Sequence, residues 1–236
     1  MIDYRVIEQR LVEGLYISRR PVAVTFADAA PAGTPRFLGT VPSGCSFWRI
    51  AASGRTFSTV PSDHYNCAIG SYTHNISLPG ERAGELTQML TFMTGLGYIR
   101  MEELPGIRRL RKTPGVVIFA PLGDTPVAPD VVVFAGLPGR VMLLQEAAIR
   151  AGLMPQASLL GRPSCMALPV ALAQGTVAST GCIGNRVYTD VGEDELYVVV
   201  PGRDLLKVSD EVETIVAANT RLFEYHRERR QALATE

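Results

Sequence analysis

The chain has 236 residues, of which 47% are hydrophobic and 19% are charged, so it can bury a substantial core and is not a disordered segment. Its 23 basic and 23 acidic side chains give a net charge of zero, which disfavours nucleic acid and acidic lipid surfaces as partners. No apolar run reaches the roughly 18 residues of a membrane span, and the charged N-terminus is unlike a secretory signal. We therefore expect a cytoplasmic protein whose four cysteines stay reduced.

The first half of the chain is predicted to open with a helix at Tyr4–Ile17, where apolar residues recur at helical spacing. A strand is expected at Pro21–Asp28, and a short helix begins at Cys45 and closes at Gly54. A second strand, residues 55–60, leads into the stretch STVPSDHYNCAIGSY, and another helix is expected at Gly80–Gly95.

The second half contains two apolar runs, residues 115–122 and 129–136, that are typical of buried strands. A helix at Val141–Ala151, a strand at residues 195–201 and a terminal helix at residues 208–232 follow. We expect an α/β or α+β fold, with a mixed sheet and flanking helices, in a single domain of residues 1–236.

An internal repeat links residues 19–98 to residues 114–207. Each copy places a cysteine at a helix start, a glycine at the helix end, a Ser-Thr pair, and a second cysteine on a glycine-containing turn. The first copy carries an insertion, VPSDHYN, before its second cysteine, whereas the second copy reads compactly as ASTGCIGNRVY. The repeat predicts two pseudo-symmetric halves.

The motifs CSFWRIAASG, NCAIGS, PDVVVFAGLPGRVMLLQEA, SCMALPVALAQG and STGCIGNRVY together resemble the DUF169 family of prokaryotic proteins, from about Pro21 to Lys207. The resemblance implies an intracellular prokaryotic domain in which the cysteine-bearing segments are family features. It implies no reaction.

The four cysteines are the main candidate site, because all of them lie inside the repeated motifs. Packing of the halves about a twofold axis would bring Cys45, Cys67, Cys165 and Cys182 together as ligands of an iron-sulfur cluster, of the 4Fe-4S type. Zinc, or no cofactor, is the alternative, and the absence of C-x2-C pairs favours the cluster. Such a protein would serve electron transfer, sensing or a redox reaction.

Two further hypotheses stay open. The helix starts at Cys45 and Cys165 should lower the thiol pKa, which suits a cofactor-free thiol enzyme or redox switch using Cys45 or Cys182. Alternatively, the cysteines only pack as small apolar residues in a structural or interaction module.

Polar residues beside the cysteines complete the candidate site. His64 could act as a base or ligand, oriented by Asp63, unless Asp63 only caps the turn. Arg186, with Asn185 before it, could hold a small anionic molecule, or else form a structural ion pair with Asp190. A redox partner is the other expected partner, and His74 is a weaker candidate than His64.

Overall fold

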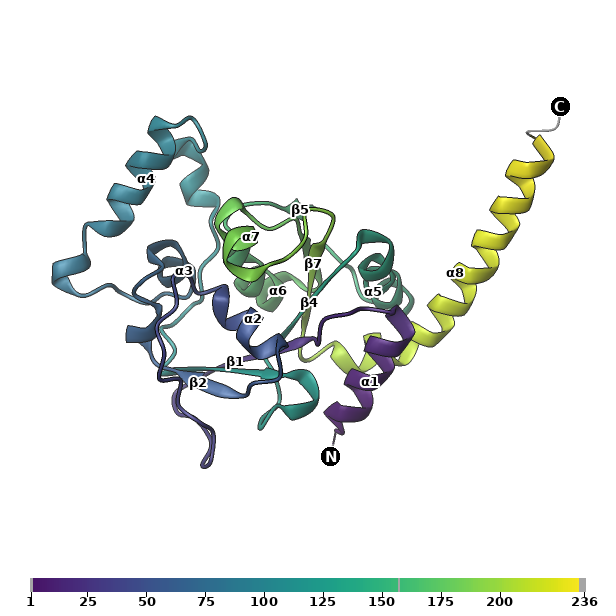
Figure 1. Cartoon of the computed structure of the whole chain (residues 1–236), viewed down its shortest axis with the longest axis horizontal. Helices are drawn as coiled ribbons and strands as arrows, with labels where there is room; N and C mark the ends of the chain where they lie inside the picture. The colour runs from purple at the N-terminus through teal and green to yellow at the C-terminus, as the bar shows by residue number, and fades with distance from the viewer. Residues whose placement is uncertain (1, 157, 234–236) are drawn as a thin grey trace.

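A seven-stranded mixed sheet forms the centre of the protein in a computed structural model that describes residues 2–156 and 158–233 (Figure 1). The strand order is β2-β3-β1-β4-β7-β6-β5, and all neighbours are antiparallel except β5 and β6. The strands are β1 (Val22–Ala27), β2 (Phe57–Thr59), β3 (Val116–Pro121), β4 (Val131–Gly136), β5 (Leu159–Leu160), β6 (Val177–Ser179) and β7 (Leu196–Pro201).

The sheet consists of two parts, with the order β1-β3-β2 in the first and β4-β7-β6-β5 in the second. In each part the strand that comes first in the chain pairs with the one that comes last, β1 with β3 and β4 with β7, whereas β5 has no counterpart in the first part. β1 and β4 join the parts through three antiparallel residue pairs, Val22 with Val133, Ala23 with Val132 and Val24 with Val131. The twofold symmetry of the two halves stays a prediction.

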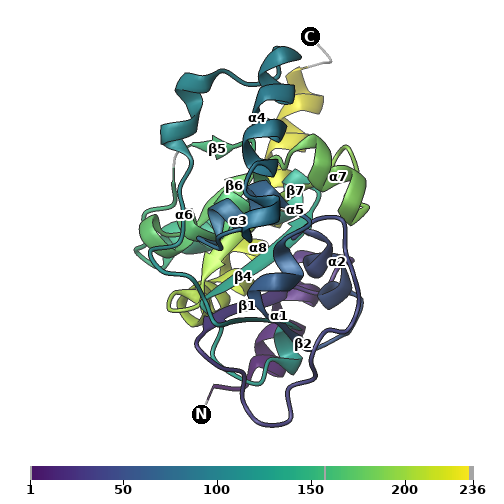
Figure 2. The same cartoon turned by 90° about the vertical axis from the view of Figure 1, so that its left-hand side faces the viewer.

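Helices cover both faces of the sheet (Figure 2). One face packs against α2 and α6, with α3 and α7 beside them, and the other packs against α1, α5 and α8. The helices are α1 (Tyr4–Leu15), α2 (Ser46–Ala52), α3 (Ala68–Thr73), α4 (Glu85–Gly95), α5 (Pro138–Arg150), α6 (Ala167–Gln174), α7 (Ile183–Thr189) and α8 (Leu205–Leu233), with short 3-10 turns η1 (Pro61–His64), η2 (Gly80–Arg82), η3 (Met101–Gly106), η4 (Leu122–Asp124) and η5 (Ser164–Met166).

Strand alternation explains the two apolar layers. In β4, Val131 and Val133 face the α2 and α6 side, while Val132 and Phe134 face the α1, α5 and α8 side. Because successive side chains point to opposite faces, a continuous apolar run is what a strand buried on both faces requires. The sequence-based fold class, a mixed sheet with flanking helices, is confirmed.

The cysteine turns predicted after each Ser-Thr pair are wrong in detail, because both cysteines instead begin short helices. Cys67 is the N-cap of α3, where its sulfur accepts a hydrogen bond from the Gly70 N–H at 3.3 Å, and Cys182 is the N-cap of α7. Neither helix exceeds seven residues, too short for an apolar period to mark it in the sequence.

The terminal helix, α8, includes the predicted span 208–232 and extends away from the body of the protein in Figure 1. Leu205, Val208 and Val212 anchor its first turns in the core, whereas every residue from Thr220 to Leu233 is exposed. None of the helices formed by the described residues has the length and apolar character needed to cross a membrane.

The close approach of Gly202, at the end of β7, to the chain before β4 allows a test of this edge of the β4–β7 pair. A Cβ at Gly202 would lie 1.7 Å from the carbonyl oxygen of Pro129, two residues before β4. Gly202→Ala should therefore lower the free energy of unfolding by about 1–3 kcal/mol, as overpacking does. Gly139→Ala is the control, because a Cβ there meets no atom within 4 Å. Urea unfolding measures the free energy of unfolding of both variants. Equal stability of the two would contradict the close approach of Gly202 to Pro129.

Candidate functional site

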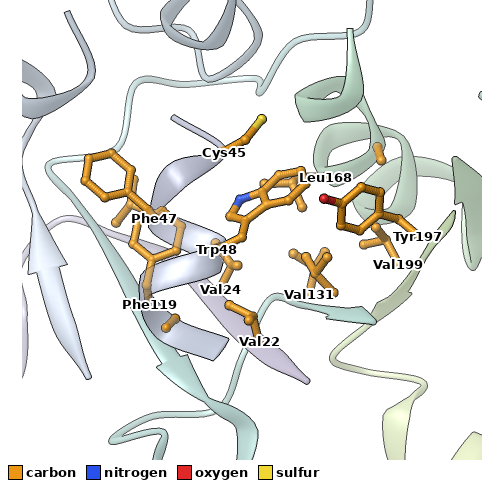
Figure 3. Packing of buried hydrophobic residues seen from close by; sticks show 14 of the residues in the cluster. Val22, Val24, Cys45, Phe47, Trp48, Phe119, Val131, Leu168, Tyr197 and Val199 are labelled. Carbon is orange, nitrogen blue, oxygen red and sulfur yellow. The ribbon is translucent and has the colours of Figure 1, made fainter. Parts of the chain in front are cut away.

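The four cysteines lie on the face of the sheet that α2 and α6 cover. Cys45 precedes α2 and Cys165 lies in η5, and both are buried, while Cys67 and Cys182 are partly exposed and all four are free thiols. Figure 3 shows Cys45 at the start of α2, beside the aromatic residues of the apolar cluster. The thiols are close enough for Cys67 and Cys182 to influence the pKa of Cys45 and Cys165.

The predicted four-cysteine metal or iron-sulfur site is wrong. Among residues 2–156 and 158–233, no three side chains of His, Cys, Asp or Glu are grouped so that they could hold a metal ion. The thiols therefore share a region of the interior without forming the tetrahedral set that zinc or a cluster requires. Each cysteine belongs to a separate short helical segment, with Cys45, Cys67 and Cys182 at the N-caps of α2, α3 and α7 and Cys165 within η5.

The expectation of activated thiolates at the helix starts is also wrong. Burial, with a smaller contribution from neighbouring Cys67, raises the pKa of the Cys45 thiol to about 12. Burial likewise raises the pKa of Cys165 well above its ordinary value. Loss of hydration outweighs the dipole of a helix that has only seven residues in α2, so both thiols stay protonated and are poor nucleophiles. The structure contains no disulfide among the described cysteines.

His64 is buried and neutral. Burial, together with the positive charge of Arg36, lowers its pKa to about 4. Its Nε2 lies 2.8 Å from Thr59 Oγ1, and that hydroxyl donates to the Val117 carbonyl oxygen at 3.2 Å. The hydroxyl must therefore accept from Nε2–H, which leaves His64 Nδ1 as an acceptor.

Asp63 does not contact the His64 ring. Its carboxylate accepts from the Val60 N–H at 2.7 Å and pairs with Arg36 at 2.7 Å. These contacts match the alternative in which Asp63 caps the turn. The catalytic roles assigned to His64 and Asp63 from the sequence stay predictions.

Arg186 uses its guanidinium to hold the chain around α7. It donates to the carbonyl oxygens of Thr180 at 2.6 Å, Glu195 at 3.0 Å and Gly192. Asp190, its expected partner, pairs instead with Arg49 at 2.8 Å. These contacts give Arg186 a structural use, and its binding of an anionic molecule stays a prediction.

Asn185 is buried between the two halves of the protein. It lies close enough to the Cys45 thiol and to the Tyr197 hydroxyl to influence their pKa values, and burial raises the pKa of Tyr197 to about 12. Neither of its amide atoms makes a well-formed hydrogen bond with a described residue. A Cβ placed on Gly181 would lie 3.0 Å from Asn185 Oδ1 and 3.6 Å from Ser164 Oγ, so both oxygens face the same glycine.

The residues beside Asn185 lead on to the two buried histidines. Cys165, next to Ser164, lies close enough to Thr73 for that residue to influence its pKa, and the following His74 packs against His64 with ring centroids 5.7 Å apart. A Cβ on Gly44 would lie 3.9 Å from His64 Nδ1, so His64 lies beside the residue that precedes Cys45. We call these residues the polar ring: Gly44, Cys45, His64, Thr73, His74, Ser164, Cys165, Gly181 and Asn185.

The polar ring contains most of the protein's unpartnered buried groups. Ten buried side-chain nitrogen and oxygen atoms among the described residues have no hydrogen-bond partner, and six of them belong to four members of the ring. They are His64 Nδ1, His74 Nδ1 and Nε2, Ser164 Oγ, and Asn185 Nδ2 and Oδ1. Burial, with a smaller contribution from His64, lowers the pKa of His74 to about 3, so this ring is neutral too.

Comparison with known proteins places this site within a family. The DUF169 family model, described as "Uncharacterised ArCR", matches residues 10–211 and so includes the whole polar ring. The chain belongs to the DUF169 family. No curated protein and no solved structure matches this DUF169 protein.

Sequence reasoning does not identify four members of the ring: Gly44, Thr73, Ser164 and Gly181. It also places His74 below His64, although both residues are 2% exposed. His74 is flanked by Thr73 and Asn75, so no apolar pattern in the sequence marks it as buried.

The buried thiols predict a specific labelling pattern. Iodoacetamide at pH 8 should modify Cys67 and Cys182 in the folded DUF169 protein, while Cys45 and Cys165 should react only after unfolding. Peptide mass spectrometry at timed intervals measures each site, and a urea-unfolded sample supplies the reference rate. Labelling of Cys45 at that reference rate in the folded protein would contradict its burial.

The two buried histidines predict how stability depends on pH. Their folded pKa values, about 4 and about 3, lie below the ordinary 6.5, so the unfolded chain takes up protons first as the pH falls. The contribution of these two neutral histidines to the free energy of unfolding is fully present above pH 6.5. It decreases below that pH by up to about 1.4 kcal/mol per pH unit for each histidine. Urea unfolding from pH 7 to pH 5 measures the slope.

Two variants test whether the pH dependence of the free energy of unfolding comes from the buried histidines. His74→Phe should remove about half of the pH dependence, because one of the two titrating groups is gone. His226→Gln, on the exposed part of α8, should keep all of it. A flat stability profile in the unmodified protein would show that the histidines can be protonated within the fold.

Proposed function

We propose that this DUF169 protein binds a small uncharged molecule, carrying both hydrogen-bond donors and acceptors, within the polar ring. The single observation that carries the proposal is that four residues of the ring hold six buried polar atoms without a hydrogen-bond partner. A buried polar group without a partner costs roughly 1–3 kcal/mol, so several together are expected only where something else supplies the partners.

The charge state of the ring supports an uncharged ligand. His64 and His74 are neutral and the Cys45 and Cys165 thiols are protonated, so no ring residue offers a charge to pair with an ion. An ion buried there would lose its hydration without gaining an opposite charge. An uncharged ligand with mixed donors and acceptors matches the ring better.

The atoms of the ring also indicate the kind of ligand. His64 Nδ1 is free to accept a hydrogen bond, and the Asn185 amide and Ser164 hydroxyl can each both donate and accept. A compact amide or a nitrogen heterocycle carries complementary groups along one edge. This chemistry describes a ligand-binding protein, such as a sensor or carrier, and includes no covalent step.

Extraction and a ligand screen test the proposal. Protein purified without denaturant is precipitated in methanol, and the supernatant is searched by mass spectrometry for a stoichiometric small molecule. In parallel, adenine, uracil and nicotinamide are compared with acetate and phosphate in thermal unfolding. Ligand at about 100 times its Kd should raise the free energy of unfolding by about 2.7 kcal/mol. The uncharged compounds are expected to act, and the ions are not.

A matched pair of serine variants locates the effect. Ser164→Ala deletes an unpartnered hydroxyl, so the ligand-free variant should be at least as stable as the unmodified protein while its ligand-induced shift decreases. Ser53→Ala, an exposed serine at the end of α2, should retain the full shift. Absence of both an extracted molecule and any ligand-induced shift would refute the proposal.

A further inference from the structure

A second site lies outside the polar ring, in a cleft of about 480 Å³ between the end of β1, the helix α6 and residues 108–112. Four of the five residues in that segment are basic, although the whole chain has no net charge. The residues that line the cleft from this segment are Arg108, Arg109, Leu110, Arg111 and Lys112.

The basic segment is fixed to α3 rather than free in solution. Arg109 donates to the Tyr72 carbonyl oxygen at 2.9 Å and to Asn75 Oδ1 at 2.6 Å, and its guanidinium lies 4.3 Å from the centre of the Tyr72 ring. The Leu110 N–H donates to the Thr73 carbonyl oxygen at 2.8 Å. These contacts hold the neighbouring cations in place at the cleft.

Two of those cations have no partner. Among the described residues, neither Arg108 nor Arg111 makes a hydrogen bond or an ion pair, and both are exposed. Lys112 lies 3.5 Å from Asp28, but these side chains are 80% and 85% exposed, so that pair is weak. Asp130, the other acid at the cleft, already accepts a hydrogen bond from the Phe26 N–H at 2.7 Å.

Much of the remaining lining of the cleft is apolar. It includes Phe26, Pro169, Leu172 and Ala173, from β1 and α6. A cleft lined by both unpaired guanidinium groups and apolar side chains matches a ligand with an anionic head and an apolar body. Its volume lies within the roughly 300–1,000 Å³ typical of small-molecule sites.

We infer that this cleft binds a small organic anion, with a carboxylate or phosphate head held by Arg108 and Arg111 and an apolar body against Phe26 and Leu172. A polyanion such as nucleic acid matches less well, because the zero net charge provides no extended basic surface beyond the cleft. This site is distinct from the polar ring, and it does not depend on the ligand proposed there.

Two fluorescent probes of similar shape test the inference. 8-Anilinonaphthalene-1-sulfonate carries an anionic head, whereas N-phenyl-1-naphthylamine has the same aromatic body without it. The folded protein should bind the sulfonate probe about tenfold or more tightly than the neutral probe, and added salt should weaken only the sulfonate. Phenyl phosphate or benzoate should displace the sulfonate probe, and which of them does so identifies the preferred head group.

Charge-matched variants connect the binding to the cleft. Arg108→Gln combined with Arg111→Gln should weaken binding of the sulfonate probe about tenfold or more, with little effect on the neutral probe. Arg227→Gln combined with Arg230→Gln, on the exposed part of α8, makes the same change in net charge and should have no effect. Thermal unfolding verifies that both double variants are folded, as expected for exposed positions.

Three results would overturn the inference. They are equal affinity for the two probes, equal effects of the two double variants, and failure of both phenyl phosphate and benzoate to compete. A single-stranded DNA of about 20 nucleotides completes the test, because tighter, arginine-dependent binding of this DNA than of the sulfonate probe would assign the cleft to a polyanion instead.

Discussion

The antiparallel pairing of β1 with β4 is the constraint on which the rest of the structure depends. Only three residue pairs join the two parts of the sheet, yet they place α2 and α3 from one part beside α6 and α7 from the other. The polar ring draws Cys45, His64 and His74 from the first part and Ser164 and Asn185 from the second. Neither part contains the site alone, so the site exists only when this pairing has formed.

Burial, rather than position on a helix, determines the chemistry of the interior. The start of α2 should favour a thiolate at Cys45, but loss of hydration acts in the opposite direction and dominates. The same effect keeps His64 and His74 uncharged. Phe26 lies between this neutral interior and a charged part of the surface, because it lines the basic cleft and also contacts the His74 ring with centroids 5.4 Å apart.

Much of the fold could be predicted from local patterns, whereas the site could not. Runs such as residues 131–136 identify buried strands because every position is apolar, and the long stretch of apolar residues at helical spacing in α8 identifies a helix. The short helices α3 and α7 have no such pattern, and the burial of Asn185 depends on contacts with Cys45 and Tyr197 that are distant in the sequence. Four cysteines in repeated motifs indicated the correct region, but a metal site also requires ligands to converge, and convergence is a property of tertiary packing.

The projecting part of α8 can lose its helical structure without unfolding of the core. From Thr220 onward every described residue is exposed, so this segment is stabilised by its own backbone hydrogen bonds and not by the core. An isolated helix of that length is marginal in water, and its hydrogen bonds open without disturbing the sheet. Far-ultraviolet circular dichroism will therefore register the loss of this segment as a gradual slope before the cooperative transition. Fluorescence from Trp48, buried in the apolar cluster and 5.5 Å from the Tyr197 ring, reports on the core itself.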